Sequence, residues 1–239
     1  MNLSIVSIAR PGQSSYHGQT VTSELGFDYA NFYKHTDNWV DIDTQAHSLR
    51  EKLQYRADRR NEAVKITLEK WPETTDLMML DSFYIGETRA LIELIETYRK
   101  LESPACLGPA IWARLRTTIS QVFHSETRFY DAWATPELRW CPYGWRPEKD
   151  VLTSQEIMPV KGFYKVSSIG GCYLFPRSIW DKGTRFSVPE DLHGCEHNGF
   201  HASHNLPKYI DFNTEMFRVK AYSLAKCVRC SIGNWQRTR

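Results

Sequence analysis

The chain of 239 residues is 41% hydrophobic and 24% charged, which is typical of one large α/β domain and excludes a mainly disordered chain. With 30 Lys and Arg against 28 Asp and Glu, the formal charge is +2, which argues against binding to nucleic acid or to an anionic membrane. The sequence has no signal-peptide pattern and no run of roughly 18 uninterrupted apolar residues, so we expect no membrane span and a cytoplasmic location.

The first predicted elements are a strand and a long helix. Residues 3–8 alternate apolar and small polar side chains and stop at Arg10-Pro11-Gly12, which predicts a strand followed by a sharp loop. Residues 13–43 have no clear period and remain unassigned. Apolar residues then recur at helical spacing from Thr44 to Trp71, and Pro72 ends this pattern.

A short apolar run at 77–80, closed by Asp81, predicts a buried parallel strand. Helical spacing resumes over 87–101, and a further strand is expected around 105–107. This alternation of strands and helices predicts an α/β fold with a parallel sheet covered on both faces. In the second half we expect two strands and a short helix, at 163–167, 172–175 and 177–181.

Asp81 is the first candidate site residue, because ligands of open α/β sheets bind beyond the carboxyl ends of the strands. A carboxylate there can hold a divalent cation that bridges the two phosphates of a nucleotide. The alternative is that Asp81 caps the following helix or turn.

Basic residues cluster on the helix that leads into this strand. The guanidinium groups of Arg56, Arg59 and Arg60 suit phosphate contacts, and the amide of Asn61 suits a base edge or a ribose hydroxyl. The alternative is a solvated helix face, paired with Glu51, Asp58 and Glu62.

The second half contains two further candidate groups. Gly170-Gly171 allow a close approach of the backbone to a sugar ring, or alternatively form a bulge or tight corner. In segment 190–204, Glu196 is the first candidate for a general base or acceptor anchor, with Asp191 as its main competitor. His201 and His204 are candidate metal ligands. A zinc site of His193, His197, His201 and Cys195 is a rival interpretation, which Gly194 and Gly199 weaken because they disfavour the necessary helix.

A different class of function also fits the sequence. Aromatic residues, including Trp133, Trp140 and Trp145, could form a carbohydrate- or protein-binding surface on a non-catalytic scaffold. Structural zinc would then lie near the histidines or at Cys227-x-x-Cys230. A nucleotidyltransferase is a further alternative, although it would need a second carboxylate and a Gly-rich phosphate loop.

Several of these features, taken in order, resemble the GT-A class of nucleotide-sugar glycosyltransferases over about residues 3–205. They are the first strand and its loop, the Arg-x-x-Arg-Arg-Asn helix, the strand closing in Leu80-Asp81-Ser82, the Gly-Gly pair and the late acidic loop. Within that class, segments 59–63 and 129–133 are similar to fungal capsule-type α-1,3-mannosyltransferases. Segment 196–200 is similar to yeast Golgi α-mannosyltransferases.

The resemblance implies a Rossmann-like GT-A fold with a central, mostly parallel sheet flanked by helices. It implies one domain, with a nucleotide-binding half at 1–110 and an acceptor-side half at 111–239. The donor would be a UDP- or GDP-linked sugar, and the acceptor a hydroxyl of a glycan, protein or lipid. The expected nucleotide contacts are Ala9, Arg10, Arg56, Arg59, Asn61, Asp81, Ser82, Gly170 and Gly171.

The resemblance also implies a Mn²⁺ or Mg²⁺ ion on the diphosphate, with Asp81 as its carboxylate ligand. The metal motif of the class is Asp-x-Asp, and Phe83 stands at its second acidic position. The second ligand is therefore expected from His201 or His204, unless the ion is held weakly through water or is absent.

Overall fold

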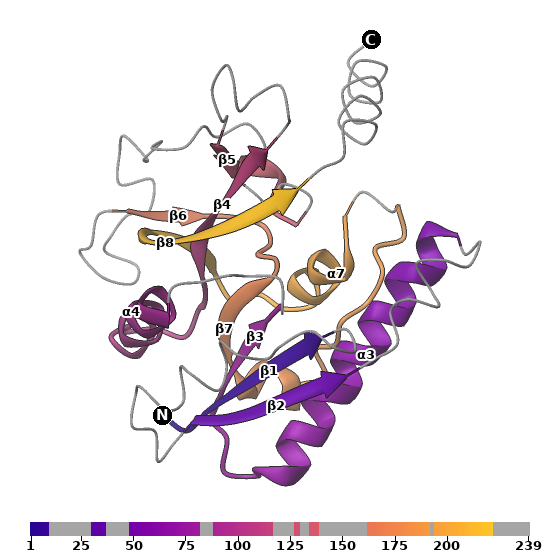
Figure 1. The fold of residues 1–239 in the computed structure, drawn as a ribbon. Coiled ribbons are helices and arrows are strands. Elements are labelled where there is room, and N and C mark those ends of the chain that lie inside the picture. The colour runs from indigo at the N-terminus through magenta and orange to yellow at the C-terminus, as the bar shows by residue number, and fades with distance from the viewer. Residues whose placement is uncertain are drawn as a thin grey trace.

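A computed structural model describes residues 1–9, 30–36, 48–81, 88–116, 127–129, 134–138, 162–191 and 194–221 (Figure 1). Its elements are, in chain order, β1 (Leu3–Ala9), β2 (Ala30–Thr36), α3 (Leu49–Lys70), β3 (Asp76–Leu80), α4 (Thr88–Arg99), β4 (Cys106–Arg116), β5 (Thr127–Phe129), the 3-10 helix η1 (Pro136–Leu138), β6 (Phe163–Lys165), β7 (Cys172–Pro176), α6 (Arg177–Asp181), α7 (Glu196–Ala202) and β8 (Lys208–Ala221).

The described strands form one mixed sheet in the order β2-β1-β3-β7-β4-β8-β6, with β5 paired to β4. Strand β1 is parallel to β2 and β3, and β4 is parallel to β8. Strand β7 lies between β3 and β4 and is antiparallel to both, because the chain enters it at Cys172, opposite the carboxyl end of β3 at Leu80. The mixed α/β class is thus confirmed, but the expectation of a mostly parallel sheet fails at β7 and at the pairs β4–β5 and β6–β8.

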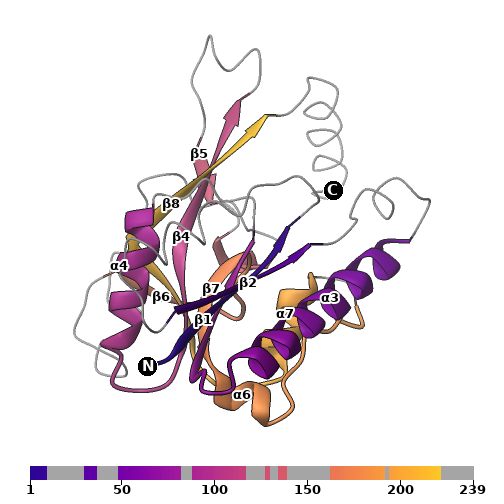
Figure 2. The same cartoon turned by 60° about the horizontal axis from the view of Figure 1, so that its bottom comes forward.

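Helices cover both faces of this sheet, as the strand–helix alternation predicts. One face packs Val6, Met79 and Tyr173 with residues of α3, α6 and α7 in one apolar cluster. The other face packs Met78 and Leu174 with residues of α4. Figure 2 shows α4 on one side of the sheet and α3, α6 and α7 on the other. Successive strand residues therefore enter two separate cores, which explains why β3 is apolar and buried from Leu77 to Leu80.

Helix α3 is fixed at both ends by local interactions. Ser48 caps its first turn in a reciprocal capping box with Glu51, and the helix stops at Lys70, before Trp71 and Pro72. The buried side of α3 consists of Leu53, Ala57, Arg60, Ala63, Val64 and Thr67. Arg60 thus lies on the face turned to the sheet, among apolar residues.

The remaining differences from the expected elements lie mainly in the second half. Strand β4 continues through Gly108-Pro109 to Arg116, and the strands β2 and β8 were not predicted. Residues 196–202, expected within a loop, form the helix α7, because its residues pack into the core despite Gly199.

In the described part of the chain, no helix combines the length and the apolar character of a membrane span.

Candidate functional site

Arg60 lies at the centre of a buried ion-pair network that joins three elements. Its side chain is only 4% exposed on the inner face of α3. Its Nη1 donates to Asp81 Oδ1 at 2.7 Å, directly after β3, and its Nε donates to Glu196 Oε1 at 3.1 Å, on the first turn of α7. One guanidinium thus ties the carboxyl end of a central strand to two helices.

The charges of this network support one another. Burial alone would lower the pKa of Arg60 and raise the pKa values of Asp81 and Glu196, because it disfavours the charged forms. The attraction between the guanidinium and the carboxylates outweighs burial. The pKa of Arg60 is therefore raised, and the pKa values of Asp81 and Glu196 lie below their ordinary range. All three groups are charged at neutral pH.

A second set of contacts connects Asp81 to α7 through Gly171. The backbone N–H of Asp81 donates to Gly171 O at 2.7 Å, and Gly171 N–H donates to His197 Nε2 at 3.5 Å. With Nε2 as the acceptor, the ring proton of neutral His197 is on Nδ1, 3.2 Å from the hydroxyl of Tyr173. Burial, and then the charge of Arg60, lower the pKa of His197 to about 4, so this ring is neutral. Gly171 has a φ of 72°, a left-handed conformation that favours glycine.

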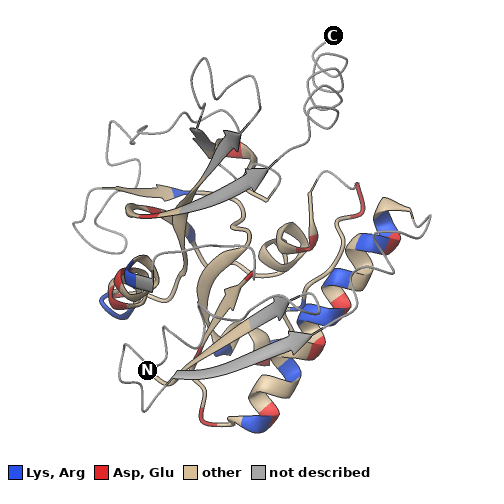
Figure 3. Ribbon diagram, in the orientation of Figure 1, with Lys and Arg blue, Asp and Glu red and all other residues tan. Residues whose placement is uncertain are grey.

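The other predicted residues of α3 have different environments from Arg60. Arg59 pairs with Glu62 along the helix and lies over the ring of Tyr55. Asn61 donates to the carbonyl of Phe186 and accepts from its N–H, both at 2.9 Å, so it fastens the segment before α7 to α3. Charged residues of both signs follow one another along this helix (Figure 3). Arg60, rather than Arg59 or Asn61, is thus the contact of Asp81.

Arg56 is half-buried one turn before Arg60. Its positive charge contributes to the lowered pKa values of Asp81 and Glu196. Among the described basic residues of α3, Arg60 and Arg56 lower the pKa values of these carboxylates.

The predicted residues of the loops lie partly outside the described chain. Ala9 ends β1, whereas Arg10 and Ser82 lie in ranges that the structure does not describe. Gly170 is buried, and its carbonyl accepts from the N–H of Cys172 at 2.8 Å. The glycine pair thus forms the tight corner at the start of β7, which was the alternative interpretation.

The two candidate acceptor-side carboxylates differ in exposure. Glu196 is 3% exposed, and its second oxygen, Oε2, is buried without a hydrogen-bond partner. Asp191 is exposed at the end of the segment that Arg50 fixes through a 2.7 Å hydrogen bond to the carbonyl of Glu190. A carboxylate that is buried and paired has a low proton affinity, so Asp191 is the more suitable base of the two.

The two predicted histidine ligands come together with a cysteine. Cys106, His201 and His204 present ligand atoms within 4.8 Å of one another, and Asp81 does not belong to this group. Burial, followed by nearby positive charges, lowers the pKa of His204 to about 4 and the pKa of His201 well below its usual value. Burial raises the pKa of the Cys106 thiol to about 12. The imidazoles are therefore neutral, and the thiol is protonated without a metal.

No family model matches the sequence, and no curated protein matches it. Among solved structures, the chain is similar to A197 from STIV, with 11% sequence identity and a TM-score of 0.47. The match covers 93% of this chain and 96% of that chain. Likeness at this level carries no conclusion about activity.

Proposed function

We propose that the chain is a nucleotide-sugar glycosyltransferase of the GT-A class. The observation that carries this proposal is the position of Asp81 at the carboxyl end of β3, beside β1. In the sheet, β1 lies between β2 and β3. The strand that follows β1 in the chain is therefore on one side of it, and the next strand is on its other side. Open α/β sheets commonly bind nucleotides beyond the carboxyl ends of the strands at such a reversal of strand order, and Asp81 lies there.

The network around Asp81 suits an anionic ligand bound through a cation. Arg60 keeps Asp81 ionised and donates a hydrogen bond to only one carboxylate oxygen of Asp81, Oδ1. The side chain of Asp81 is 15% exposed. One guanidinium and two carboxylates leave this trio with a net negative charge. A Mg²⁺ or Mn²⁺ ion is commonly held by one or two carboxylates together with substrate phosphates, and Asp81 would serve in this way. Such an ion would neutralise the charge of the departing nucleoside diphosphate.

The other residues of the site have separate roles in this proposal. Arg60 and the backbone of Gly171 orient Asp81, from the side chain and from the main chain respectively. Glu196 holds Arg60 in place. Asp191 is proposed to orient or deprotonate the acceptor hydroxyl of a glycan, protein or lipid, because it is exposed where Glu196 is not. His201 and His204 are left out of the donor site, since they face Cys106.

Thermal unfolding with UDP or GDP, with and without Mn²⁺, tests the donor site. A nucleotide present at about 100 times its Kd stabilises the folded state by about 2.7 kcal/mol. For a chain of this size, that corresponds to a rise in Tm of about 5–10 °C. The substitution Asp81→Asn is expected to abolish this rise.

Asp76→Asn is the matched control, because Asp76 lies at the amino end of the same strand. It is expected to change the Tm of the free protein without removing the nucleotide response. If neither nucleotide raises the Tm of the unsubstituted protein, with or without Mn²⁺, the donor-site proposal is wrong. If a nucleotide does raise the Tm, a screen of nucleotide sugars for hydrolysis identifies the donor.

A further inference from the structure

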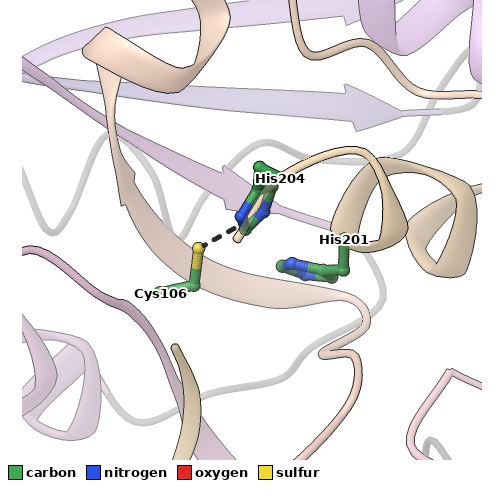
Figure 4. Close-up of side chains that lie close together, drawn as sticks. All are labelled: Cys106, His201 and His204. Atoms are coloured by element: carbon green, nitrogen blue, oxygen red, sulfur yellow. Dashed lines mark hydrogen bonds between the residues drawn. The ribbon is translucent and has the colours of Figure 1, made fainter. Parts of the chain in front are cut away.

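Cys106, His201 and His204 form a compact group on the face of the sheet that packs against α7. Cys106 begins β4, His201 is in the last turn of α7 and His204 follows this helix. Figure 4 shows the three side chains pointing toward one another. The Sγ of Cys106 lies 3.8 Å from Nε2 of His204, and all three ligand atoms lie within 4.8 Å of one another.

His201 has the hydrogen-bonding pattern of a metal ligand. Its Nε2 lies 3.1 Å from the carbonyl oxygen of Ile169, which can only accept, so Nε2 carries the ring proton. The other nitrogen, Nδ1, is buried without a hydrogen-bond partner, and the side chain is fully buried. A buried acceptor without a partner destabilises the folded state, and a bound metal ion would remove this penalty. Metal-bound histidines commonly donate their second nitrogen to a backbone carbonyl, as His201 does.

We propose that Cys106, His201 and His204 bind a zinc ion. One thiolate and two neutral imidazoles are a soft to borderline donor set, which favours Zn²⁺ over the oxygen-preferring Mg²⁺ and Mn²⁺. Three protein ligands leave the fourth position of a tetrahedral ion to water or to a further residue. This site is separate from Asp81 and does not depend on the proposed transferase activity.

Binding changes the protonation of two of the ligands. The thiol proton of Cys106 leaves to solvent as the Zn–S bond forms. Nδ1 of His204 accepts the N–H of Leu206 at 3.2 Å in the metal-free chain, which puts the ring proton on Nε2. Coordination through Nε2 moves this proton to Nδ1 and breaks the hydrogen bond from Leu206 N–H. Segment 203–206 is therefore the part of the site that moves, and the free energy of zinc binding to structural sites is large enough to offset the loss of one hydrogen bond.

Co²⁺ titration of the full chain, after removal of metal with a chelator, tests the site without any nucleotide. One equivalent of Co²⁺ is expected to give the visible bands of a tetrahedral ion and a near-ultraviolet thiolate charge-transfer band, and Zn²⁺ should displace it. Cys106→Ser should remove the charge-transfer band and weaken binding by more than about 100-fold, beyond the 10–100-fold typical of outer-shell contacts. His204→Gln, at a half-buried position, should weaken binding similarly and serves where the serine variant fails to fold.

Two control variants separate this site from other thiols. Cys172→Ser removes a buried strand cysteine of the same sheet and should leave the Co²⁺ spectrum unchanged. The double variant Cys227→Ser, Cys230→Ser should also leave it unchanged. The proposal is overturned if the unsubstituted chain binds no Co²⁺, or if the charge-transfer band survives in Cys106→Ser. It is equally overturned if the band disappears in the Cys227/Cys230 variant.

Discussion

The buried position of Arg60 makes a strong prediction about stability. Arg60→Met retains a long apolar side chain but removes the guanidinium that pairs directly with both Asp81 and Glu196. Those carboxylates are 15% and 3% exposed, so water cannot replace the guanidinium fully. Removing one partner of a buried ion pair costs about 3–5 kcal/mol. We expect the free energy of unfolding at pH 7 to fall by about this amount.

The pH dependence of this variant should be opposite in sign to that of the unsubstituted protein. In the unsubstituted protein, the folded-state pKa values of Asp81 and Glu196 are lowered. Their ionisation therefore contributes fully to the free energy of unfolding above the unfolded-state pKa values of about 4. This contribution is lost as the pH falls through the lower folded-state pKa values. In Arg60→Met, burial is no longer opposed by Arg60 and raises both pKa values. The variant should therefore gain stability relative to its own value at pH 7 as the pH falls toward 5.

Arg59→Met is the matched control, because it removes the same group from the neighbouring position of α3. Arg59 pairs with Glu62 in a partly exposed pair, which typically contributes about 0–1 kcal/mol. Urea unfolding followed by circular dichroism between pH 5 and 8 measures both variants. Equal losses for Arg59→Met and Arg60→Met, or the same pH slope in Arg60→Met as in the unsubstituted protein, would show that the buried network does not stabilise the fold as argued.

Further substitutions test the contacts around α7. Asn61→Ala removes two hydrogen bonds to Phe186 and should lower the free energy of unfolding by about 1–3 kcal/mol, measured by urea unfolding, while leaving any nucleotide response intact. In Gly199→Ala, the added Cβ would lie 2.0 Å from the carbonyl oxygen of Ser187, so overpacking should cost about 1–3 kcal/mol or more, although alanine favours helix. At Gly183, which has a φ of 96°, an added Cβ meets no atom within 4 Å, so Gly183→Ala should cost only backbone strain of about 1–2 kcal/mol. A larger loss of stability in Gly183→Ala than in Gly199→Ala would contradict the steric argument.

The regular part of the fold was predictable because its hydrophobic patterns are local. Strands β1 and β3, the helix α4 and the short helix α6 all follow from apolar runs or helical spacing. Strand β8 was hidden because Asp211 and Asn213 look like turn residues. In the structure, the carboxylate of Asp211 accepts from Asn213 N–H and from the Thr214 hydroxyl. This bulge lies opposite the register shift between Pro109 and Ala110 of β4, and such long-range pairing leaves no local pattern.

The candidate site was predictable in its location but not in its partners. Asp81 follows from the short strand before it. Arg60 was grouped with its basic neighbours as a phosphate ligand, although its spacing from Ala57 and Val64 places it on the buried stripe of α3. A charged residue on an apolar stripe usually has a buried partner of opposite sign, and this signal was present in the sequence. That the partners are Asp81 and Glu196 depends on tertiary packing, which sequence spacing does not report.

Helix α7 explains why the two groups of polar residues occur so close together. It has seven residues, too few to be stable through helix propensity alone, so its packing must hold it. Glu196 at its start contacts Arg60, His197 contacts Gly171, and His201 in its last turn faces Cys106. Phe200, between these polar residues, stacks on Phe186 with ring centroids 4.5 Å apart and also packs against Phe175. The aromatic contacts fix the helix on the sheet, so that its polar residues reach the carboxyl end of β3 and the start of β4.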